Sequence, residues 1–432
     1  MKRIAVWVGM ALLSLPAWAS GAPQQQPFPP FEVDQVKVDK AIEQGIAYLK
    51  KGNAGHMATF QHANRTMSHT ELVLFTYVHA DMPEADPAFK ELFDHMMKQK
   101  LEATYCVSLQ AMILEEVQRV KHQGRIAQCA QFLVDNQSAQ GYWGYGDPSI
   151  FVEDVPTTAP SKDVASSGGT IRKFDTLPPP GMKVKPPVRG KIKIEKKREG
   201  NPNDNSNSQY AALGMRACHD AGIIFQPAVI DKAIEWWRST QKTDKGPEEP
   251  LIEGGVAGPE KPKGGTVASS VTQNKAMPQG WCYGQHDHKA YGSMTAGAVG
   301  SMAIYSYIKD NDEGKKRSWK RDKDIHEGLQ WLAKNFSVTY NPGPYEHGDF
   351  AENSQHQYYY YLYALERAGM LYGTEIMGAH KWYPEGAKVL IANQKGDGSW
   401  EGGTVNTCFA ILFLKRATRP LDVATHSAGS KR

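Results

Sequence analysis

The sequence contains little that would place this chain in a membrane or in a disulfide-bonded scaffold. After residue 19, no apolar run approaches the roughly 20 residues that a membrane-spanning helix needs. Only five cysteines occur, an odd number, and most lie in segments with helical periodicity. We therefore expect small buried thiols and no disulfide framework. A single bridge remains an alternative if the protein reaches an oxidising compartment.

The sequence also has few strand patterns and a small net charge. The alternation of polar and apolar residues that marks a half-buried strand is almost absent, which predicts an all-α fold. The formal net charge is only +4, and one basic run, residues 183–198, holds more positive charge than that, so the rest of the chain is slightly acidic. No aromatic residues interleave with this run as a nucleic-acid groove would require. We expect no nucleic-acid partner, and contact of the run with an anionic membrane surface remains an alternative.

Two stretches have the composition of loops. Residues 147–203, which include the basic run, are rich in Pro, Ser, Thr and Gly, and residues 243–279 are rich in Gly, Pro and Lys. Both contain too few apolar residues to fold alone. We expect two long, flexible, solvated insertions within a folded domain of residues 37–420, followed by a disordered tail, 421–432.

The N-terminus has the organisation of an export signal. Residues 1–19 contain two basic residues, an apolar core and the small-x-small pattern Ala17-Trp18-Ala19 that a signal peptidase reads. We expect cleavage before Ser20, a flexible segment over residues 20–36, and an exported protein located in the periplasm or outside the cell. An uncleaved anchor is the alternative, but the apolar core of about twelve residues is short for a membrane span.

A repeated unit organises the remaining chain. In its clearest copy, apolar residues recur at helical spacing from Ala387 to Ile391 and are followed by Gln394, Gly398 and Trp400. Glycine ends the helix, and tryptophan provides a large apolar plug. A more apolar helix follows each unit, so amphipathic outer helices alternate with apolar inner ones. The other copies are Gln137/Gly141/Trp143, Gln241 with Gly280 and Trp281 after an insertion, and the eroded segments 45–49 and 328–332.

Six such hairpins predict an (α/α)6 toroid. The expected outer helices are 37–51, 86–100, 122–136, 227–241, 321–336 and 380–394. The expected inner helices are 69–80, 104–118, 206–221, 293–308, 354–370 and 404–418.

The Gln…Gly-x-Trp repeats resemble the QW motifs of squalene and hopene cyclases and, more broadly, the terpenoid cyclase and protein prenyltransferase toroid superfamily. The resemblance covers most of residues 37–418 outside the insertions. It implies a toroid with a central cavity but no single activity, since related toroids occur among polysaccharide lyases and thioester-containing macroglobulins. A class II cyclase would carry an Asp-x-Asp-Asp acid motif, and at that place this chain has Asp204-Asn205-Ser206-Asn207. The departure argues against proton-initiated cyclisation.

The inner helices of such a toroid all run in the same direction, so polar residues at their starts meet at one mouth of the cavity. Capping explains some of them, because Ser, Thr, Asp and Asn satisfy free N–H groups at a helix start. Histidines there suit acid–base work or anions. The candidates for catalysis are His288, Tyr291, His356 and Asp349. The candidates for ligand binding are His69, Tyr105, Asp204, Asn207, Gln209, Asp287, Asn353 and Asn406.

Metal and thioester chemistry fit the sequence less well. Protein prenyltransferases hold zinc with Asp, Cys and His, but Cys282, Asp287 and His288 do not have that family's spacing. The segment Cys282-Tyr283-Gly284-Gln285 is not the Cys-Gly-Glu-Gln run of a thioester domain. We predict no metal ion and no cofactor.

Three functions remain open. The first is a cyclase-like or prenyltransferase-like repeat toroid that binds an apolar or extended ligand, a small molecule or a polymer, in its cavity. The second is a polysaccharide lyase or hydrolase on the same ring, with His or Tyr as base and the run Tyr358–Tyr361 as a sugar platform. Core packing is the alternative for that run. The third is a non-catalytic binding or scaffold protein that uses its inserted loops.

Overall fold

Helices dominate the computed structural model, which describes residues 33–155, 185, 188–202, 204–243, 249–250, 275–284, 289–343, 357–401 and 403–421. All of these residues belong to one unit that begins at Val33. Twelve α-helices lie in the described residues, one for each predicted helix, and the strands there have only two or three residues. The all-α prediction is therefore confirmed. The predicted signal peptide and most of the segment that follows it lie outside the described residues, as does nearly all of the predicted tail.

The odd-numbered helices other than α5, which is buried along most of its length, bury one side and expose the other. Helix α3, for example, buries Phe89, Leu92 and Met96 on one side, while Asp86 caps its start by accepting a hydrogen bond from the backbone N–H of Ala88. The helices of this set are α1 (Gln35–Lys51), α3 (Pro87–Lys98), α5 (Gln123–Asp135), α7 (Pro227–Thr240), α9 (Lys323–Lys334) and α11 (Trp382–Asn393).

The even-numbered helices are buried along most of their length. In α10 every residue from Tyr358 to Leu371 is buried, so the tyrosine run Tyr358–Tyr361 is core packing and not an open sugar platform. Helix α8 continues past the predicted end at residue 308 through a polar last turn and stops where Gly314 takes a left-handed conformation. The helices of this set are α2 (Thr70–His79), α4 (Thr104–Gln118), α6 (Asn205–Asp220), α8 (Gly292–Glu313), α10 (Tyr358–Tyr372) and α12 (Thr404–Leu414).

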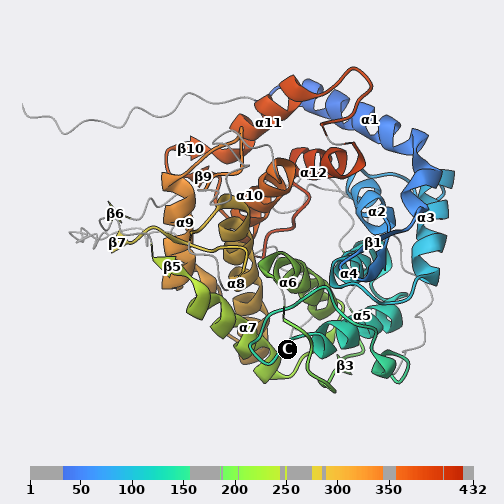
Figure 1. The fold of residues 1–432 in the computed structure, drawn as a ribbon, viewed down its shortest axis with the longest axis vertical. Helices are drawn as coiled ribbons and strands as arrows, with labels where there is room; N and C mark the ends of the chain where they lie inside the picture. The colour runs from blue at the N-terminus through green and yellow to red at the C-terminus, as the bar shows by residue number, and fades with distance from the viewer. Residues whose placement is uncertain are drawn as a thin grey trace, which may run out of the picture. The chain divides into compact units, whose positions relative to one another are not determined.

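Each even-numbered helix packs against the next one in sequence, and α12 packs against α2. The odd-numbered helices contact the outside of this set, and α11 also contacts α1 (Figure 1).

The short strands lie in the loops and pair only with one another, two at a time. The antiparallel pairs are β1 (Phe60–His62) with β2 (Arg65–Met67), β5 (Lys242–Thr243) with β8 (Gln279–Gly280), β6 (Glu249–Pro250) with β7 (Lys275–Ala276), and β9 (Ile376–Met377) with β10 (His380–Lys381). One pair, β3 (Ile192–Lys193) with β4 (Ile223–Ile224), is parallel. Three 3-10 helices, η1 (Asn53–Met57), η2 (Ile150–Val152) and η3 (Ser318–Arg321), complete the regular structure of the described residues.

The tryptophan of each clear repeat makes the same contacts. Its indole N–H donates to a carbonyl in or near the last turn of the preceding odd-numbered helix: Trp143 to Leu133 at 2.7 Å, Trp281 to Trp237 at 2.7 Å and Trp400 to Leu390 at 2.8 Å. Its backbone N–H donates to a hydroxyl in the first turn of the following even-numbered helix, which is Ser208, Thr295 or Thr407. Each indole is fully buried, and the hydrogen bond to the carbonyl oxygen satisfies its buried N–H group. The repeat therefore joins two consecutive helices.

The glutamine of the repeat links neighbouring odd-numbered helices. Gln137 donates to the carbonyl oxygen of Val229 in α7 at 2.8 Å, and Gln394 donates to that of Ala41 in α1 at the same distance. Gln241 donates to the carbonyl oxygen of Asp324 in α9 at 2.9 Å. The glutamine and the tryptophan of the repeat therefore each make hydrogen bonds that hold helices together.

Parts of the first insertion are packed against the helices, so the prediction of a solvated loop over 147–203 is wrong at those positions, while most of residues 188–202 are exposed or partly exposed. Ile192 and Ile194 are buried while the intervening Lys193 is exposed, because β3 alternates its side chains against β4. Lys185 is buried as well, and its amine lies 2.5 Å from Glu115. Residues 156–184 and most of 243–279 lie outside the described residues.

The prediction for the cysteines is confirmed. All five are free, four are buried, and Cys106 is partly buried. Four of them, Cys106, Cys129, Cys218 and Cys408, lie within helices, where they serve as small apolar side chains.

Candidate functional site

Contacts join the starts of α4 and α6, of α6 and α8, and of α10 and α12, so the N-terminal ends of these even-numbered helices lie together. Near the starts of α4 and α6, the rings of Tyr105 and Tyr210 are 4.4 Å apart. Near the ends of the same helices, Arg119 donates to the carbonyl oxygen of Asp220 at 3.1 Å. We call the two faces of this helix set the N-terminal end and the C-terminal end.

Five of the predicted site residues, His288, Asp287, His356, Asp349 and Asn353, lie outside the described residues. Three others make local contacts at helix starts. Tyr291 and His69 are the N-cap residues of α8 and α2, and both are partly buried. Asn406 donates its side-chain amide to the carbonyl oxygen of Glu401.

Gln209 lies deeper than predicted and ties three helices together. Its amide donates to the carbonyl oxygen of Ser293 in α8 at 3.2 Å. Its side-chain oxygen accepts from the Tyr360 hydroxyl at 2.9 Å and from the Arg367 guanidinium at 3.1 Å. Gln209 is 1 % exposed, so its position favours a role in packing over direct ligand contact.

A buried arginine occupies the interior between these helices. Arg367 is 2 % exposed, and its guanidinium carbon lies 4.4 Å from the ring centre of Tyr363 and within 6 Å of those of Tyr210 and Tyr360. Cation–π attraction of this kind offsets part of the cost of burying the charge. The interior is therefore filled here by aromatic and charged side chains.

Asp204 and Asn207, both predicted, are brought together at the start of α6. Asp204 caps the helix by accepting from the backbone N–H of Asn207 at 3.0 Å, and it also accepts from the Ser206 hydroxyl at 2.6 Å. The Ser206 hydroxyl is in turn 3.2 Å from the Tyr283 hydroxyl. Helix capping explains the bond between Asp204 and the backbone N–H of Asn207, but it does not explain the contact of Ser206 with Tyr283.

Tyr145 joins this group from the loop after α5. Its hydroxyl is 3.2 Å from Nε2 of His62, and it also interacts with Asp204 and Tyr283. Burial, together with these two neighbours, raises the pKa of Tyr145, so its hydroxyl keeps its proton. We call His62, Tyr145, Asp204, Ser206 and Tyr283 the Tyr145 group.

The loop that carries Tyr145 is fixed from several sides. The backbone N–H of Thr104 donates to the carbonyl oxygen of Tyr145, and the Thr104 hydroxyl donates to that of Gly144, both at 2.8 Å. Arg65 of β2 contacts the carbonyl oxygen of Gly146 and the carboxylate of Asp147. The loop is also held at the Asp147 carbonyl oxygen by Asn136 and Arg198. Such support holds a functional side chain in one position.

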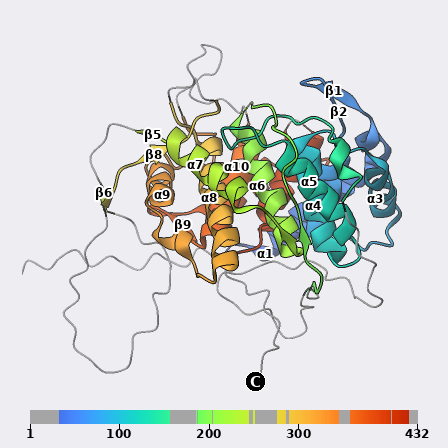
Figure 2. The same ribbon diagram turned by 90° about the horizontal axis from the view of Figure 1, so that it is seen from below.

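The Tyr145 group opens to solvent beside exposed aromatic rings. Tyr283 is 37 % exposed and Phe60 is 39 % exposed. Phe60 and His62 share one face of β1, because side chains alternate along a strand. The hairpin of β1 and β2 projects from the helices in Figure 2, and its Phe60 ring contacts His69 at 5.1 Å. This surface combines hydroxyl, imidazole and carboxylate groups with aromatic faces.

Sequence reasoning missed Tyr145 and Tyr283, although the repeats contain a signal for them. Each tyrosine stands two residues after the tryptophan of a repeat, Trp143 and Trp281. Since each tryptophan is tied to the first turn of the next even-numbered helix, a residue two positions later lies at the N-terminal end. A Trp-x-Tyr pattern would have identified both residues.

The C-terminal end contains a cavity of about 50 Å³. The residues that line it include the apolar or aromatic Phe75, Leu213 and Tyr363. They also include the charged Glu115, Glu116, Arg216 and Arg419, the last from the C-terminal segment. That volume is enough for a few water molecules but not for a lipid or a sugar chain.

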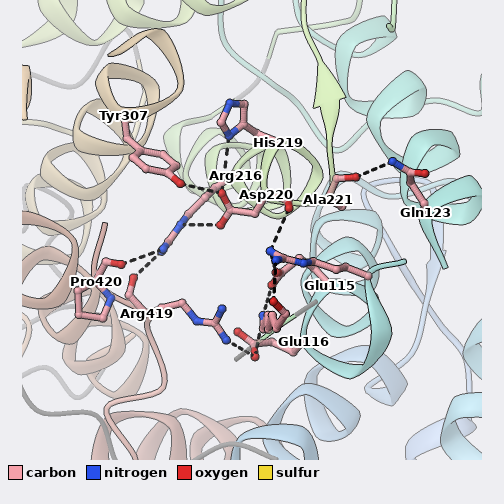
Figure 3. Close-up of polar contacts among 12 residues, drawn as sticks. Glu115, Glu116, Gln123, Arg216, His219, Asp220, Ala221, Tyr307, Arg419 and Pro420 are labelled. Atoms are coloured by element: carbon pink, nitrogen blue, oxygen red, sulfur yellow. Dashed lines mark hydrogen bonds and ion pairs between the residues drawn. The ribbon is translucent and has the colours of Figure 1, made fainter. Parts of the chain in front are cut away.

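A buried network of charges surrounds this cavity (Figure 3). The Lys185 amine contacts both Glu115 and Glu116, and Arg419 contacts Glu116 at 2.9 Å. Arg216 donates to the carbonyl oxygens of Arg419 and Pro420. These bonds attach the C-terminal segment and the basic run to the ends of α4 and α6. Cations are also favourable at helix C-termini because of the helix dipole.

His219 and Asp220 form the second half of the network. The Tyr307 hydroxyl donates to Asp220 at 3.0 Å, and the His219 ring lies beside Asp220 (Figure 3). The other ring nitrogen of His219 lies 3.9 Å from the carboxylate of Asp312. Burial lowers the pKa of His219, but its interactions with the two carboxylates, 3.7 and 3.9 Å away, outweigh burial and raise the pKa to about 9. These contacts are structural, because they connect α6 to α8.

Among the described residues, no group of three or more His, Cys, Asp or Glu side chains is placed to hold a metal ion. None of the helices in the described ranges is both long enough and apolar enough to cross a membrane. No protein-family description and no curated protein matches this sequence.

Proposed function

We propose that this protein is an (α/α)6 toroid of the cyclase-like class that binds a polysaccharide chain at its N-terminal end and cleaves it by acid–base catalysis. The succession of contacts among the even-numbered helices, with α12 against α2, supports the toroid. So does the bond from Gln394 in the last repeat to Ala41 in α1.

The Tyr145 group carries the functional part of the proposal. A hydroxyl that keeps its proton, an imidazole and a carboxylate lie within one hydrogen-bonded group. The hydroxyl can donate a hydrogen bond to a sugar oxygen, and the imidazole and carboxylate are side chains of the kinds that take part in proton transfer. Sugar hydroxyl groups both donate and accept hydrogen bonds, and this group offers partners for both. The exposed rings of Tyr283 and Phe60 provide surfaces on which sugar faces stack.

The interior of the helix set favours a polar ligand at the end over an apolar ligand inside. Arg367 and three tyrosine rings fill the space where a cyclase-like protein would need an apolar cavity. An apolar chain placed there would face a buried charge. A polymer lying across the N-terminal end avoids that cost.

Export is part of the proposal, since a polysaccharide-cleaving enzyme meets its substrate in the periplasm or outside the cell. The support comes from residues 1–19, with their basic residues, apolar core and Ala17-Trp18-Ala19 pattern.

Affinity electrophoresis in gels containing xylan, alginate, pectin or laminarin tests the proposal. We expect one of these polymers to retard the wild-type protein, and we expect Tyr283→Phe to weaken the retardation at least fivefold. Tyr372→Phe is the matched control, because it also removes a hydroxyl that lies 3.2 Å from a polar partner, here His326, but this hydroxyl belongs to the C-terminal end of α10. Equal retardation of both variants, or none of the wild type, would contradict the proposal.

A further inference from the structure

One buried carboxyl group at the N-terminal end differs from the other buried carboxyl groups of the protein. Glu71 is the second residue of α2 and is 4 % exposed, and its Oε2 atom has no hydrogen-bond partner among the described residues. Its side chain lies against the thiol of Cys106, the third residue of α4. A thiol is a weak donor and provides no charge to balance a carboxylate.

Other buried carboxylates in the described part of the chain are paired. Glu366 accepts from both the backbone N–H and the hydroxyl of Thr418, at 2.9 and 2.7 Å. Glu115 is bound by Lys185, and Asp220 lies between Arg216 and Tyr307. Since leaving a buried charge unpaired costs several kcal/mol, an unpaired carboxyl is better buried in its protonated form. A carboxyl group that is only structural would gain nothing from this arrangement.

The position of Glu71 connects it with the Tyr145 group. Tyr105, next to Cys106, contacts Tyr210, and the Tyr210 ring lies 6.4 Å from that of Tyr360. Tyr105, Tyr210 and Tyr360 therefore lie one beside the next at the N-terminal end. The start of α4 joins Glu71 to the Tyr145 group, because the backbone N–H of Thr104 donates to the carbonyl oxygen of Tyr145 at 2.8 Å and Cys106 lies two residues further along the helix. Cys106 is only partly buried, so solvent reaches this edge of the row.

We propose that Glu71 is the proton donor of this end of the protein, with Cys106 as the hydrogen-bond partner of its carboxyl group. The inference rests on the proposed function, since it assigns a role in cleavage of the polysaccharide. In hydrolysis, the proton passes from Glu71 to the glycosidic oxygen as the bond between that oxygen and the sugar carbon breaks, and the electron pair remains on the oxygen. A water molecule gives its hydroxyl group to the sugar carbon, and its remaining proton returns to Glu71.

Burial supports this role, because it raises the pKa of Glu71 to about 7, outweighing the hydrogen bond from the backbone N–H of Glu71 itself and the weaker one from the Cys106 thiol. An acid of that strength is still protonated near neutral pH and gives up its proton readily. The other titratable groups around this edge come from neighbouring elements: Tyr105 of α4, His56 of η1, His69 at the cap of α2 and Cys408 of α12.

Glu71→Gln, which keeps the shape of the side chain, is the main test. With the polymer that retards the wild-type protein, we expect cleavage, measured as release of new reducing ends, to fall at least 100-fold while retardation changes less than twofold. In infrared difference spectra of wild type against Glu71→Gln, we expect a protonated carboxyl band that disappears with a midpoint near pH 7. Cleavage within threefold of wild type, or a midpoint near the ordinary value for glutamate, would overturn the role of Glu71.

Cys106→Ala provides a second test if Glu71→Gln does not fold. Removing the thiol takes away a hydrogen bond that lowers the pKa of Glu71, so we expect the alkaline limit of cleavage to move to higher pH. An unchanged or lowered limit would count against the pair. Failure of the proposed function is distinguishable, because in that case no polymer retards the wild-type protein in the first place.

Discussion

The side-chain amide of Gln394 donates to the carbonyl oxygen of Ala41 at 2.8 Å and so joins two residues that are 353 positions apart. The same amide donates to the carbonyl oxygen of Gly398 in its own repeat at 2.9 Å. One side chain therefore organises a local turn and a contact between the last and first odd-numbered helices. Gln137 makes the equivalent pair of bonds, to Val229 and Gly141.

Replacing Gln394 by Ala removes both bonds and leaves the Ala41 carbonyl oxygen without this donor. We expect the free energy of unfolding to fall by about 1–3 kcal/mol. Urea denaturation followed by circular dichroism measures the loss. Gln35→Ala is the control, because its amide bonds an exposed carboxylate one turn away, and we expect a change within about 0.5 kcal/mol. A loss no larger than that of the control would show that the Gln394 bonds do not contribute.

Gly398→Ala tests the close approach between repeats. Gly398 has a φ of +90°, and a Cβ atom there would lie 2.3 Å from the carbonyl oxygen of Gln44. We expect a loss of more than about 2 kcal/mol, from backbone strain and steric overlap together. Gly396→Ala is the matched control, since a Cβ atom at that position meets nothing within 4 Å. Thermal melts in which the two variants lose equal stability would contradict this account of the turn.

Glu71→Gln should change how stability depends on pH. The pKa of Glu71 is raised from 4.5 to about 7 in the folded protein, so the folded state binds the proton more tightly than the unfolded state does. This contribution is fully present below pH 4.5 and is lost as the pH rises through about 7, with a total of roughly 3 kcal/mol. We expect urea titrations of wild type to show this decline and those of Glu71→Gln to lack it. Parallel pH profiles for the two proteins would refute the prediction.

His219 should contribute in the same direction but over a higher range of pH. Its pKa is raised from 6.5 to about 9, so its stabilising effect is fully present below pH 6.5 and is lost as the pH rises through about 9. We expect His219→Gln to be less stable than wild type by roughly 1–3 kcal/mol at pH 6. The difference should shrink by pH 10, which serves as the internal control. A constant difference at the two pH values would mean that packing, and not the charge on His219, is what the substitution removes.

Much of the secondary structure could be predicted from the sequence. Apolar residues at helical spacing, with glycines where the helices stop, located all twelve described helices, and only α8 continues well beyond its expected end. The buried cysteines followed from their positions in apolar helices. Strand β3 and the buried Ile192 and Ile194 were missed, because two alternating residues inside a basic, Pro-rich segment are too short a pattern to indicate a strand.

The site depended more strongly on contacts between distant residues. Asp204 and Asn207 are close in the sequence and were predicted together, whereas Tyr145 and His62 are 83 positions apart. Nothing local to either residue indicates that their side chains meet.

The sequence by itself determined where the helices lie and which repeats bind them to their neighbours, because helix formation and capping depend on residues within a few positions of one another. The tertiary structure decided which polar side chains share an environment. In the folded protein the carboxyl group of Glu71 lies beside a thiol, whereas that of Glu115 accepts a hydrogen bond from a lysine 70 positions away. Burial and pairing are properties of the packed helices, and these set the chemistry of a carboxyl group.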